Sequence, residues 1–350
     1  MSKFYQEVSE RLQIDGNEVF NFYLKHRQAD FVQNGVRIYG EKRKGAFNNV
    51  KAIYNVIRLT KPDLIISNFS YINPAILCGK LLGVKRNIAW FHSAYGFTKP
   101  SRFKVLNKRL YLKMADLVIA NSPQLQNELH KIYGVRKQKT TAIPFWTNIK
   151  QYEAEDLPTL NYENEKIFKI GCPGRLEFEK NQHTVIKSIS TLSLESDKSI
   201  KLYIAGKGSY RQELENLVSR LKLKNHVVFL DALSVNEMIS FYKEMDLIVL
   251  PSFHEAFGLV FIEALALGKP VLVSSKFGAL DFIDPTRFDI TNFSFNPHVK
   301  ADLTQKINHV INYGSLDAVY YKRLYQETFD KEVIYQKIKS IFTKDISVSA

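Results

Sequence analysis

The chain has 350 residues, of which 45% are hydrophobic and 24% are charged. Single hydrophobic cores rarely grow beyond roughly 250 to 300 residues, so this length favours two domains with a cleft between them. The ordinary composition excludes an intrinsically disordered protein. The sequence holds no apolar run near the roughly 18 residues of a membrane span, and its start, MSKFYQEVSERL, lacks the apolar stretch of a signal peptide. We therefore expect a cytoplasmic protein that does not cross the bilayer.

The two cysteines, Cys78 and Cys172, lie far apart in the sequence and do not have the spacing of metal ligands. This usage fits a reducing compartment and argues against a disulfide framework or a zinc site. We expect both side chains to be buried as small hydrophobic groups.

The positive charge is confined to the first part of the chain. Residues 1–150 contain 25 Lys and Arg against 9 Asp and Glu, whereas the remainder contains 24 against 26. The first half therefore carries a net charge of +16. A basic half predicts an anionic partner, such as a membrane surface or a nucleic acid. Zinc-finger spacing and the aromatic signature of an RNA-recognition sheet are both missing, so we do not expect nucleic acid as the partner.

The densest basic segment, KPSRFKVLNKRLYLK, places apolar residues between six cations. The cations are Lys99, Arg102, Lys104, Lys108, Arg109 and Lys113. On a helix this pattern gives an apolar stripe flanked by positive charge, which is typical of a segment lying on an anionic membrane surface. The alternative is a helix whose apolar side faces the core and whose basic side is solvated. Both interpretations stay open at this point.

The apolar runs alternate with helical patterns along the chain. The β-rich runs of the first half lie at residues 17–24, 36–40, 63–69, 87–92 and 116–122, and a second set lies at 168–174, 201–208, 226–230, 246–252 and 269–275. Strands alternating with helices predict parallel sheets with crossover helices, so we expect two doubly wound α/β domains facing each other across a cleft. We place the first domain at residues 1–148 and the second at 165–316. The polar stretch 146–166 is expected to be the linker, and one last helix, from about 317 to 342, to dock on either domain.

The segment HEAFGLVFIEALALGKPV carries the most informative motif. Here LIVLPS reads as a strand, FHEAF as a loop and GLVFIEALAL as a helix that ends near Gly268. Ligands of open parallel sheets bind beyond the carboxyl ends of the strands, where this loop falls. The first helical turn at Gly258 offers amides and a positive dipole to a phosphate, and glycine lets the anion approach closely. Glu255 and Glu263 would be repelled by the phosphate, so we expect them to bind hydroxyl groups on either side of it.

A second loop supplies positive charge. The strand FKIGCPG is followed by RLEFEKNQHT, which places Arg175 and Lys180 beyond another carboxyl end. Two cations beside a helix N-terminus would bracket a diphosphate. Each feature alone is weak, because an Arg and a Lys five residues apart are usually solvated and the Gly-Lys-Gly at Gly206 is usually only a turn. The prediction of a diphosphate site depends on finding these features in this order along one α/β unit.

These segments resemble a known family. GRLEFEKNQ, YIAGKGSYRQEL, VVFLDAL and PSFHEAFGLVFIEALALGKPVLVS are similar to the C-terminal half of retaining glycosyltransferases of family four, which have the two-domain GT-B fold. NIAWFHSAYG and ADLVIANSPQLQNEL resemble the first domain of that family, and IPFWTNIKQY its interdomain passage. The resemblance implies an enzyme that moves a sugar from a nucleotide-sugar donor to an acceptor.

The resemblance also implies roles for individual residues. Arg175 and Lys180 would bind the diphosphate, Glu255 the sugar hydroxyls and Glu263 the ribose. His92 would face the donor sugar from across the cleft, so that the catalytic set is Glu255, His92, Arg175 and Lys180. Further donor contacts are expected from Gly206, Ala256, Phe257, Gly258, Leu259 and Val260.

Two of these residues have competing interpretations from the sequence alone. A histidine that follows a buried strand, like His92, is more often a satisfied structural residue than a catalytic one. Glu263 lies among apolar neighbours on its helix, where an unpaired charge is costly, so we expect it to have a partner. Ser122 and Pro123 are interpreted as a helix N-cap and first helical residue.

No D-x-D motif occurs, so we expect no metal and no cofactor beyond the nucleotide sugar. The basic first half predicts a lipid-linked or glycan acceptor at the anionic inner face of the cytoplasmic membrane, as in lipopolysaccharide, O-antigen or capsule synthesis. The base, the sugar and the linkage are not specified by these motifs.

One departure from the family pattern keeps alternatives open. KFYQEVSERLQIDGNEVF resembles the helix that follows the family's first strand and glycine-rich loop, so we expect both to be absent and the neighbouring strands to have unpaired backbone groups. A non-catalytic nucleotide-sugar binder or partner subunit is therefore the first alternative. A nucleotide-sugar epimerase of the same fold is the second, although it gives no reason for the basic first domain.

Overall fold

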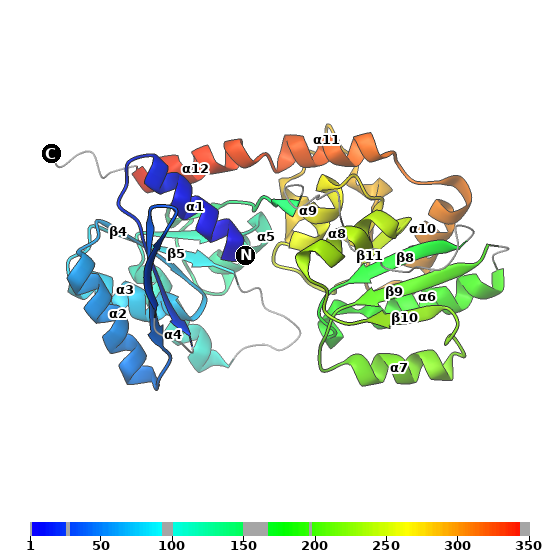
Figure 1. The fold of residues 1–350 in the computed structure, drawn as a ribbon, viewed down its shortest axis with the longest axis horizontal. Coiled ribbons are helices and arrows are strands. Elements are labelled where there is room, and N and C mark those ends of the chain that lie inside the picture. Colours follow the sequence, from blue (N-terminus) through cyan, green and yellow to red (C-terminus); the bar gives the residue numbers. More distant parts are fainter. Residues whose placement is uncertain (1, 26–28, 93–100, 150–166, 196–197, 344–350) are drawn as a thin grey trace. The chain divides into compact units, whose positions relative to one another are not determined.

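The computed structural model describes residues 2–25, 29–92, 101–149, 167–195 and 198–343, and Figure 1 shows its fold. The chain divides into two compact α/β units. Unit 1 contains the described residues up to Phe145 and those from Lys331 onward, and unit 2 runs from Trp146 to Asp330. Most of the expected linker, residues 150–166, lies outside the described residues.

Unit 1 begins with a helix and three successive strands, and strands then alternate with helices. In chain order its elements are α1 Ser2–Ile14, β1 Phe20–Lys25, β2 Ala29–Gln33, β3 Val36–Lys42, α2 Ala46–Thr60, β4 Leu64–Asn68, η1 Phe69–Tyr71, α3 Ile72–Leu81, β5 Arg86–Phe91, α4 Arg102–Met114, β6 Leu117–Ala120, α5 Pro123–Lys131, η2 Lys137–Lys139, β7 Thr140–Ala142 and α12 Lys331–Thr343. Helix α5 begins as the sequence predicts, because Ser122 caps it by accepting a hydrogen bond from the amide of Leu125 and Pro123 is its first residue.

The strands of unit 1 form two sheets. One has the order β1-β3-β2 and the other the order β4-β5-β6-β7, whose pairs are all parallel. Strand β1 pairs with β3 in parallel, but β2 pairs with β3 in an antiparallel hairpin that the sequence analysis did not predict. Its turn is Asn34-Gly35, with φ of 50° and 79° at these two residues. Asn-Gly suits the left-handed turn that matches the twist of a two-stranded hairpin, so the signal was present in the sequence.

Strand β1 forms an edge of the first sheet, and one side chain satisfies part of that edge. The backbone amide of Leu24 donates a hydrogen bond to the hydroxyl of Tyr71, 2.8 Å away. The same hydroxyl donates to the backbone carbonyl oxygen of Leu24 at 3.3 Å. Tyr71 lies between β4 and α3, so its side chain connects the two sheets. Phe22 of β1 and Ile65 of β4 pack on the same core as Ile53. The two sheets therefore share one hydrophobic core, although within the described residues β1 and β4 do not pair with each other.

The last part of the chain is two helices rather than one. Helix α11 (Ala318–Thr328) ends before Phe329 and α12 begins at Lys331, so the single helix expected over 317–342 was wrong. Helix α12 packs on α1 within unit 1. The hydroxyl of Tyr335 donates to a carboxylate oxygen of Asp15 at 2.6 Å, and Arg11 pairs with Glu332 at 2.8 Å.

Unit 2 is built on one six-stranded sheet. Its elements are β8 Phe168–Pro173, η4 Phe178–Lys180, α6 Gln182–Glu195, β9 Ile200–Ala205, α7 Arg211–Arg220, β10 Val227–Leu230, α8 Val235–Glu244, β11 Leu247–Leu250, α9 Leu259–Ala266, β12 Val271–Ser274, η5 Gly278–Phe282, η6 Ile290–Asn292, β13 Ser294–Phe295, α10 Lys300–Tyr313 and α11. The strand order is β10-β9-β8-β11-β12-β13, and every pair is parallel. The order reverses between β8 and β11, which is the doubly wound arrangement that the sequence predicts.

The core of unit 2 explains the apolar runs of the second half. Buried aliphatic side chains from β8, β9 and β11 pack on α6, α7 and α10, and Leu202 and Ile204 are fully buried. Cys172 lies in this core and Cys78 is buried in unit 1, and both are free thiols, which confirms the expectation for the cysteines. Burial raises the pKa of the Cys172 thiol to about 12, so this side chain stays protonated and behaves as a hydrophobic group.

The described helices include none that is both long and apolar enough to cross a lipid bilayer.

The hydrogen bonds between the Tyr71 hydroxyl and the backbone of Leu24 lead to a testable prediction for stability. Replacing Tyr71 with Phe removes the hydroxyl that satisfies the edge amide of Leu24. We expect the free energy of unfolding to fall by about 1 kcal/mol, the usual net worth of such a hydrogen bond. Urea unfolding monitored by circular dichroism measures this, with Tyr313→Phe as the control because Tyr313 is 80% exposed. Equal unfolding free energies for the two variants would show that the Tyr71 hydroxyl does not stabilise the edge strand.

Candidate active site

The loops after β8 and β9 pack backbone against backbone. The amide of Gly174 donates to the carbonyl of Ala205 at 2.9 Å, and that of Leu176 to the carbonyl of Lys207 at 3.0 Å. A Cβ atom on Gly206 would lie 2.0 Å from the carbonyl oxygen of Gly174, so only glycine fits there. The structure thus gives Gly206, expected as a donor contact, a packing role at the carboxyl edge of the sheet.

Two predicted site residues meet directly in this region. The ammonium group of Lys180, after β8, forms an ion pair with a carboxylate oxygen of Glu255, after β11. Their side chains are only 20% and 22% exposed. The backbone of Glu255 is fixed in turn, because its amide donates to Lys276 at 3.1 Å and its carbonyl accepts from Gly278 at 3.0 Å. A cation and a carboxylate are therefore held side by side at the carboxyl ends of adjacent strands.

Asn181 joins three loops of this edge, a role that was not predicted from the sequence. Its side-chain amide donates to the carbonyls of Pro251 at 3.0 Å and Pro297 at 3.2 Å, and it is fully buried. Its backbone is left-handed, with φ of 59°, which asparagine tolerates better than most residues. Asn181 therefore places Lys180 beside the loop that carries Glu255. An asparagine at the turn from a 3-10 helix into α6 was the available signal.

Gly258 begins the helix that was expected to bind phosphate. It has a left-handed φ of 101°, and a Cβ atom there would lie 2.3 Å from the ring of Phe277 and 3.3 Å from Cγ of Glu255. Glycine is thus required by its conformation and by the ring beside it. Helix α9 runs over Leu259–Ala266 and ends before Gly268, as predicted. Its first turn includes Leu259 and Val260, with Ala256 and Phe257 in the loop before it.

Glu263 lies inside α9 and has a buried partner. The hydroxyl of Tyr242, on α8, donates to its carboxylate at 3.0 Å, which confirms the expectation that this carboxylate is paired. Burial raises the pKa of Glu263 to about 7, and the hydrogen bond from Tyr242 opposes that rise. Tyr242 is fully buried on a helix that starts with a capping box of Ser234 and Glu237. Nothing in the sequence marked Tyr242 as a partner, because it reads as one more apolar position of an amphipathic helix.

Arg175 lies at the start of the same loop as Lys180 and is exposed. Its carbonyl accepts a hydrogen bond from the side chain of Gln182 at 2.9 Å, so the backbone at this position is fixed while the guanidinium faces solvent. An exposed guanidinium beside a fixed backbone can turn towards an anion without losing a buried contact.

His92 belongs to unit 1, where it follows β5 and is 8% exposed. The ring amide of Trp90 donates to Oδ1 of Asn121 at 2.8 Å, so the Asn121 amide nitrogen faces Nδ1 of His92 at 2.6 Å and donates to it. The proton of His92 is therefore on Nε2, which lies 2.8 Å from Oδ1 of Asn68 and 2.9 Å from the hydroxyl of Tyr5. This network fixes the tautomer.

The same surroundings keep His92 uncharged. Burial lowers the pKa of His92 to about 3. At neutral pH the ring is thus a neutral donor through Nε2 rather than a proton acceptor. The role that the resemblance gives to His92 stays a prediction, and any such role must use this donor.

Within the described part of the chain, histidine, cysteine and acidic side chains form no group of three or more that could hold a metal ion. The cationic side chains at the carboxyl edge of unit 2 include those of Arg175 and Lys180.

Comparison with known families identifies the class of protein. Residues 1–150 match the model of glycosyltransferase family 4, and residues 156–327 match that of glycosyl transferases group 1. Together these matches extend over both units. The chain belongs to the glycosyltransferases of this family and has their GT-B fold.

The relatives are moderately similar in sequence. An uncharacterised glycosyltransferase of Methanocaldococcus jannaschii is 25% identical over 292 residues, which is 77% of this chain and 71% of the relative. The alpha-monoglucosyldiacylglycerol synthase of Streptococcus pneumoniae is 30% identical over 52% of this chain and 45% of its own length. The capsular polysaccharide biosynthesis glycosyltransferase CapM of Staphylococcus aureus is 26% identical over 68% and 64%. The chain thus spans about half to two thirds of the length of several relatives.

Solved structures share the fold at low identity. HepE of Anabaena, in complex with UDP, has a TM-score of 0.72 with 21% identity and covers 88% of this chain and 86% of its own. The sucrose-phosphate synthase of Thermosynechococcus elongatus has a TM-score of 0.78 with 20% identity over 97% and 92%. These likenesses show the fold.

The raised pKa of Glu263 predicts how stability depends on pH. The carboxyl group binds its proton more tightly in the folded state, with a pKa of about 7, than in the unfolded chain. Its contribution to stability is therefore fully present below the unfolded pKa and is lost as the pH rises towards 7. We expect that loss to be up to about 3 kcal/mol relative to Glu263→Gln, since one pKa unit corresponds to about 1.4 kcal/mol.

Urea unfolding of the unmodified protein and of Glu263→Gln at pH 4.5, 6 and 8 measures this difference. Other titrating groups are the same in both proteins and cancel in the comparison. A difference in unfolding free energy that does not change with pH would show that Glu263 titrates normally.

Proposed function

We propose that this chain is a retaining glycosyltransferase that moves a hexosyl group from a nucleotide-sugar donor without the help of a metal ion. The observation that supports it best is the Lys180–Glu255 ion pair at the carboxyl edge of the unit 2 sheet, beside the first turn of α9. An enzyme that binds a nucleotide sugar needs a cation for the diphosphate and a carboxylate for the sugar hydroxyls, and the two must lie no farther apart than the length of that ligand. Lys180 and Glu255 meet this requirement. HepE, with the same fold, has been solved with UDP and with UDP-glucose, which supports a nucleotide-sugar donor.

The chemistry follows from where charge develops. As the bond between the sugar and the phosphate breaks, negative charge grows on the diphosphate and positive charge on the sugar ring. Lys180, Arg175 and the amides at the start of α9 stabilise the growing negative charge. In a reaction with retention the acceptor hydroxyl approaches the face that the phosphate leaves, and a phosphate oxygen takes its proton. A side-chain base is therefore not required.

The ion pair also suggests how the donor is received. In this structure Lys180 is already neutralised by Glu255. A diphosphate would share the ammonium group with Glu255, and the carboxylate would then be freer to accept hydrogen bonds from sugar hydroxyls. Glu263, with one oxygen held by Tyr242, would bind the ribose. Binding the donor in this way exchanges hydrogen bonds rather than leaving a buried charge without a partner.

We propose a lipid-linked or polysaccharide acceptor at the inner face of the cytoplasmic membrane, in bacterial cell-surface glycan synthesis. The relatives named for glycolipid and capsule synthesis support this choice. Helix α4 supports it too. Phe103, Leu106 and Leu110 are 77%, 64% and 59% exposed and fall on one face of the helix, whereas Leu112 is fully buried on another face.

The basic side chains of α4 flank the exposed apolar face. Arg102, Lys104, Arg109 and Lys113 are exposed, and Lys99 lies outside the described residues. Lys108 differs from the expectation, because it turns inward over the ring of Phe91, and burial lowers its pKa to about 8.

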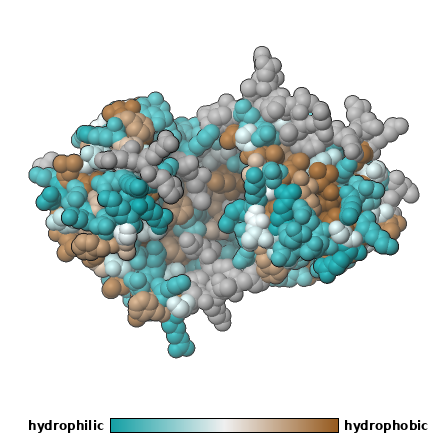
Figure 2. Space-filling model, turned by 60° about the horizontal axis from the view of Figure 1, so that its bottom comes forward, coloured by the Kyte–Doolittle hydropathy of each residue, from teal (hydrophilic) through white to brown (hydrophobic). Residues whose placement is uncertain are grey.

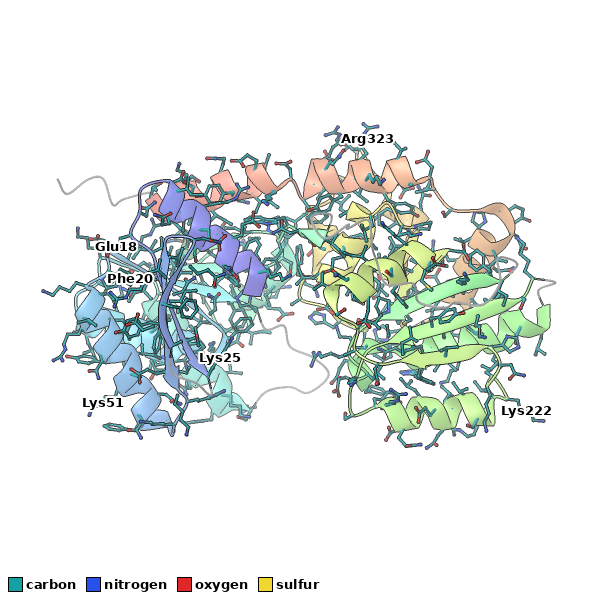
Figure 3. The ribbon with its side chains drawn as sticks, viewed as in Figure 1. Glu18, Phe20, Lys25, Lys51, Lys222 and Arg323 are labelled. Atoms are coloured by element: carbon teal, nitrogen blue, oxygen red, sulfur yellow. The ribbon has the colours of Figure 1, made fainter. Side chains whose placement is uncertain are left out.

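Figure 2, which turns the lower side of Figure 1 forward, shows hydrophobic and hydrophilic side chains side by side on the surface of unit 1. In Figure 3 the basic residues Lys25 and Lys51 lie in the lower part of the same unit. Apolar side chains among cations suit an anionic bilayer.

A nucleotide-sugar binder without transferase activity is a second candidate. The observation in its favour is that both ring nitrogens of His92 are engaged by Asn121, Asn68 and Tyr5. A binder would take up the nucleotide sugar without releasing nucleoside diphosphate, so the assay below separates the two candidates.

Replacing Glu255 tests the proposed transfer. Thermal-shift screening with UDP-glucose, UDP-galactose and GDP-mannose first identifies a donor, because a ligand that binds only the native state raises the apparent stability. With that donor we expect Glu255→Gln to lower the rate of nucleoside diphosphate release on the order of 100-fold, since an interaction with the developing charge is lost. Glu215→Gln is the control, because Glu215 forms a similar ion pair with Arg211 on the surface of α7. Similar rates for both variants would refute the role of Glu255.

Sedimentation with vesicles tests the membrane association. Phe103→Ser combined with Leu106→Ser should lower binding to phosphatidylglycerol vesicles about tenfold, because apolar area that enters the interface is lost. The matched control is Ile14→Ser with Leu59→Ser, which removes two equally exposed apolar side chains elsewhere in unit 1. If the control pair lowers binding as much as the α4 pair, the assignment to α4 is wrong.

A further inference from the structure

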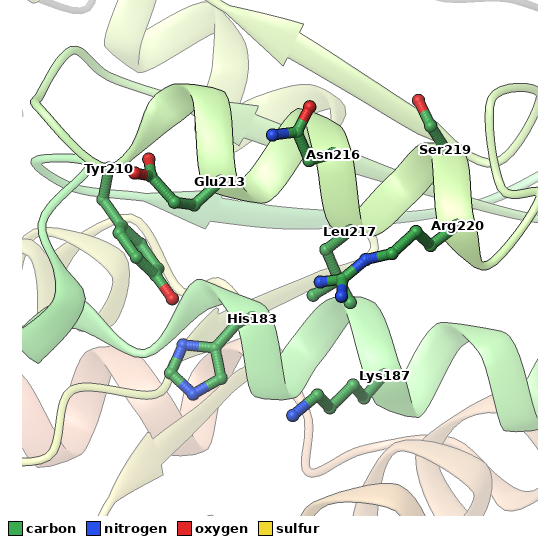
Figure 4. Close-up of a pocket in the computed structure, with 8 residues that line it drawn as sticks. All are labelled: His183, Lys187, Tyr210, Glu213, Asn216, Leu217, Ser219 and Arg220. Carbon is green, nitrogen blue, oxygen red and sulfur yellow. The ribbon is translucent and has the colours of Figure 1, made fainter.

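A cavity lies between α6 and α7 in unit 2, and the proposed function does not use it. Its volume is about 650 Å³, within the size range of small-molecule sites. The lining consists of His183 and Lys187 on α6 and of Tyr210, Asn216 and Arg220 on the α7 side, and in Figure 4 the side chains of Tyr210, Leu217 and Arg220 extend towards α6. Leu217 belongs to the hydrophobic core, so the floor of the cavity is apolar and its walls are polar.

Two cations line this cavity, Lys187 from α6 and Arg220 from α7. In Figure 4 the guanidinium group of Arg220 lies near Leu217, and the side chain of Lys187 runs along α6 in the direction of His183. Neither forms an ion pair with any residue that the structure describes. Glu213 also lines the cavity, but it lies at the other end, beside Tyr210. The lining therefore carries one net positive charge, with Glu213 at the opposite end from Arg220.

The end of the cavity beside Glu213 is aromatic. The rings of His183 and Tyr210 lie 6.1 Å apart at 76°, and Phe178 stacks on His183 at 5.5 Å. Burial lowers the pKa of His183, so its ring is neutral at pH 7. Its Nδ1 atom is buried and has no hydrogen-bond partner among the described residues. This end of the cavity therefore consists of uncharged ring surface beside the carboxylate of Glu213.

The aromatic surface continues beyond the cavity. Phe178 is 46% exposed and also contacts Phe253 at 5.8 Å, which in turn stacks on His298 at 5.2 Å. Phe178 belongs to the same turn, η4, as Lys180. The rings of His183 and Phe253 also lie 5.8 Å apart, so these rings form a compact cluster that adjoins both the cavity and the turn that carries Lys180.

We propose that this cavity binds an acidic sugar unit of a glycan chain, with the neighbouring units lying along Phe178 and Phe253. The sugar carboxylate pairs with Lys187 and Arg220, whose planar guanidinium matches a carboxylate with two parallel hydrogen bonds. Hydroxyl groups of the same sugar pair with Glu213 and Asn216, and the sugar ring lies against His183 and Tyr210. A single net positive charge favours a monoanionic carboxylate over a phosphate of higher charge.

The inference rests on the proposed function in one respect, since a glycosyltransferase has a glycan to hold. Such a site would retain an acidic acceptor or product close to the donor between successive transfers. When part of the glycan is bound at a second site, the effective concentration of its reacting end at the candidate active site rises, although the reacting groups are unchanged.

Calorimetry with trigalacturonate and with maltotriose tests the proposal. The two probes are similar in length, and only the first carries carboxylates. We expect trigalacturonate to bind at least about tenfold more tightly than maltotriose, and Lys187→Ala and Arg220→Ala each to weaken its binding by about tenfold. Lys224→Ala is the matched control, because Lys224 is exposed in the same unit and does not line the cavity. Phe178→Ala should weaken trigalacturonate binding as well, because it removes one of the aromatic rings on which the neighbouring sugar units lie.

Binding of UDP to the same variants separates this proposal from the proposed function. We expect Lys187→Ala and Arg220→Ala to bind UDP as the unmodified protein does, since these residues lie outside the candidate active site. A protein that binds trigalacturonate as predicted but takes up no nucleotide sugar would overturn the transferase proposal alone. Equal binding of maltotriose, unchanged binding by both variants, or equally tight competition by inorganic phosphate would overturn the acidic-sugar site.

Discussion

The candidate active site depends on the ion pair between Lys180 and Glu255. These residues follow β8 and β11, the two strands between which the order of the sheet reverses. At such a point the loops on either side diverge and leave room for a ligand. Asn181, in the loop after β8, ties that loop to the one after β11 through the carbonyl of Pro251 and to the one after β13 through the carbonyl of Pro297. The charges are thus positioned by buried hydrogen bonds, and a ligand does not have to order them.

Buried polar side chains take two different forms in this protein. His92 is surrounded by hydrogen-bond partners that fix one tautomer, and burial lowers its pKa, so it is locked in a single neutral state. Glu263 has one neutral partner, Tyr242, and burial raises its pKa to about 7. The first arrangement gives a rigid donor that is insensitive to pH. The second leaves a carboxyl group whose charge depends on what binds beside it, because a bound hydroxyl group stabilises the ionised form.

The sequence was sufficient to predict the doubly wound second unit and most residues of its carboxyl edge, because glycine, charge and strand signals there coincide. It was not sufficient where tertiary contacts decide. Tyr242 has the pattern of a core residue, and only the fold shows that its hydroxyl meets Glu263. Lys108 was grouped with the exposed cations, but α4 has two apolar sides, and periodicity does not tell which of them is buried. The hairpin at Asn34-Gly35 was missed although its turn signal was present.

The division of the last two helices has a consequence for synthesis. Helix α12 packs on α1, so the hydrogen bond between Tyr335 and Asp15 joins residues 320 positions apart, whereas the described residues of unit 2 all lie between Trp146 and Asp330. On the ribosome, unit 2 can complete its core before α12 has emerged. Unit 1 must wait for α12, and its early helix stays without that partner until then. Contacts of such long separation also slow folding, so the emergence of residues 331–343, rather than that of the first part of unit 1, sets the moment at which unit 1 is complete.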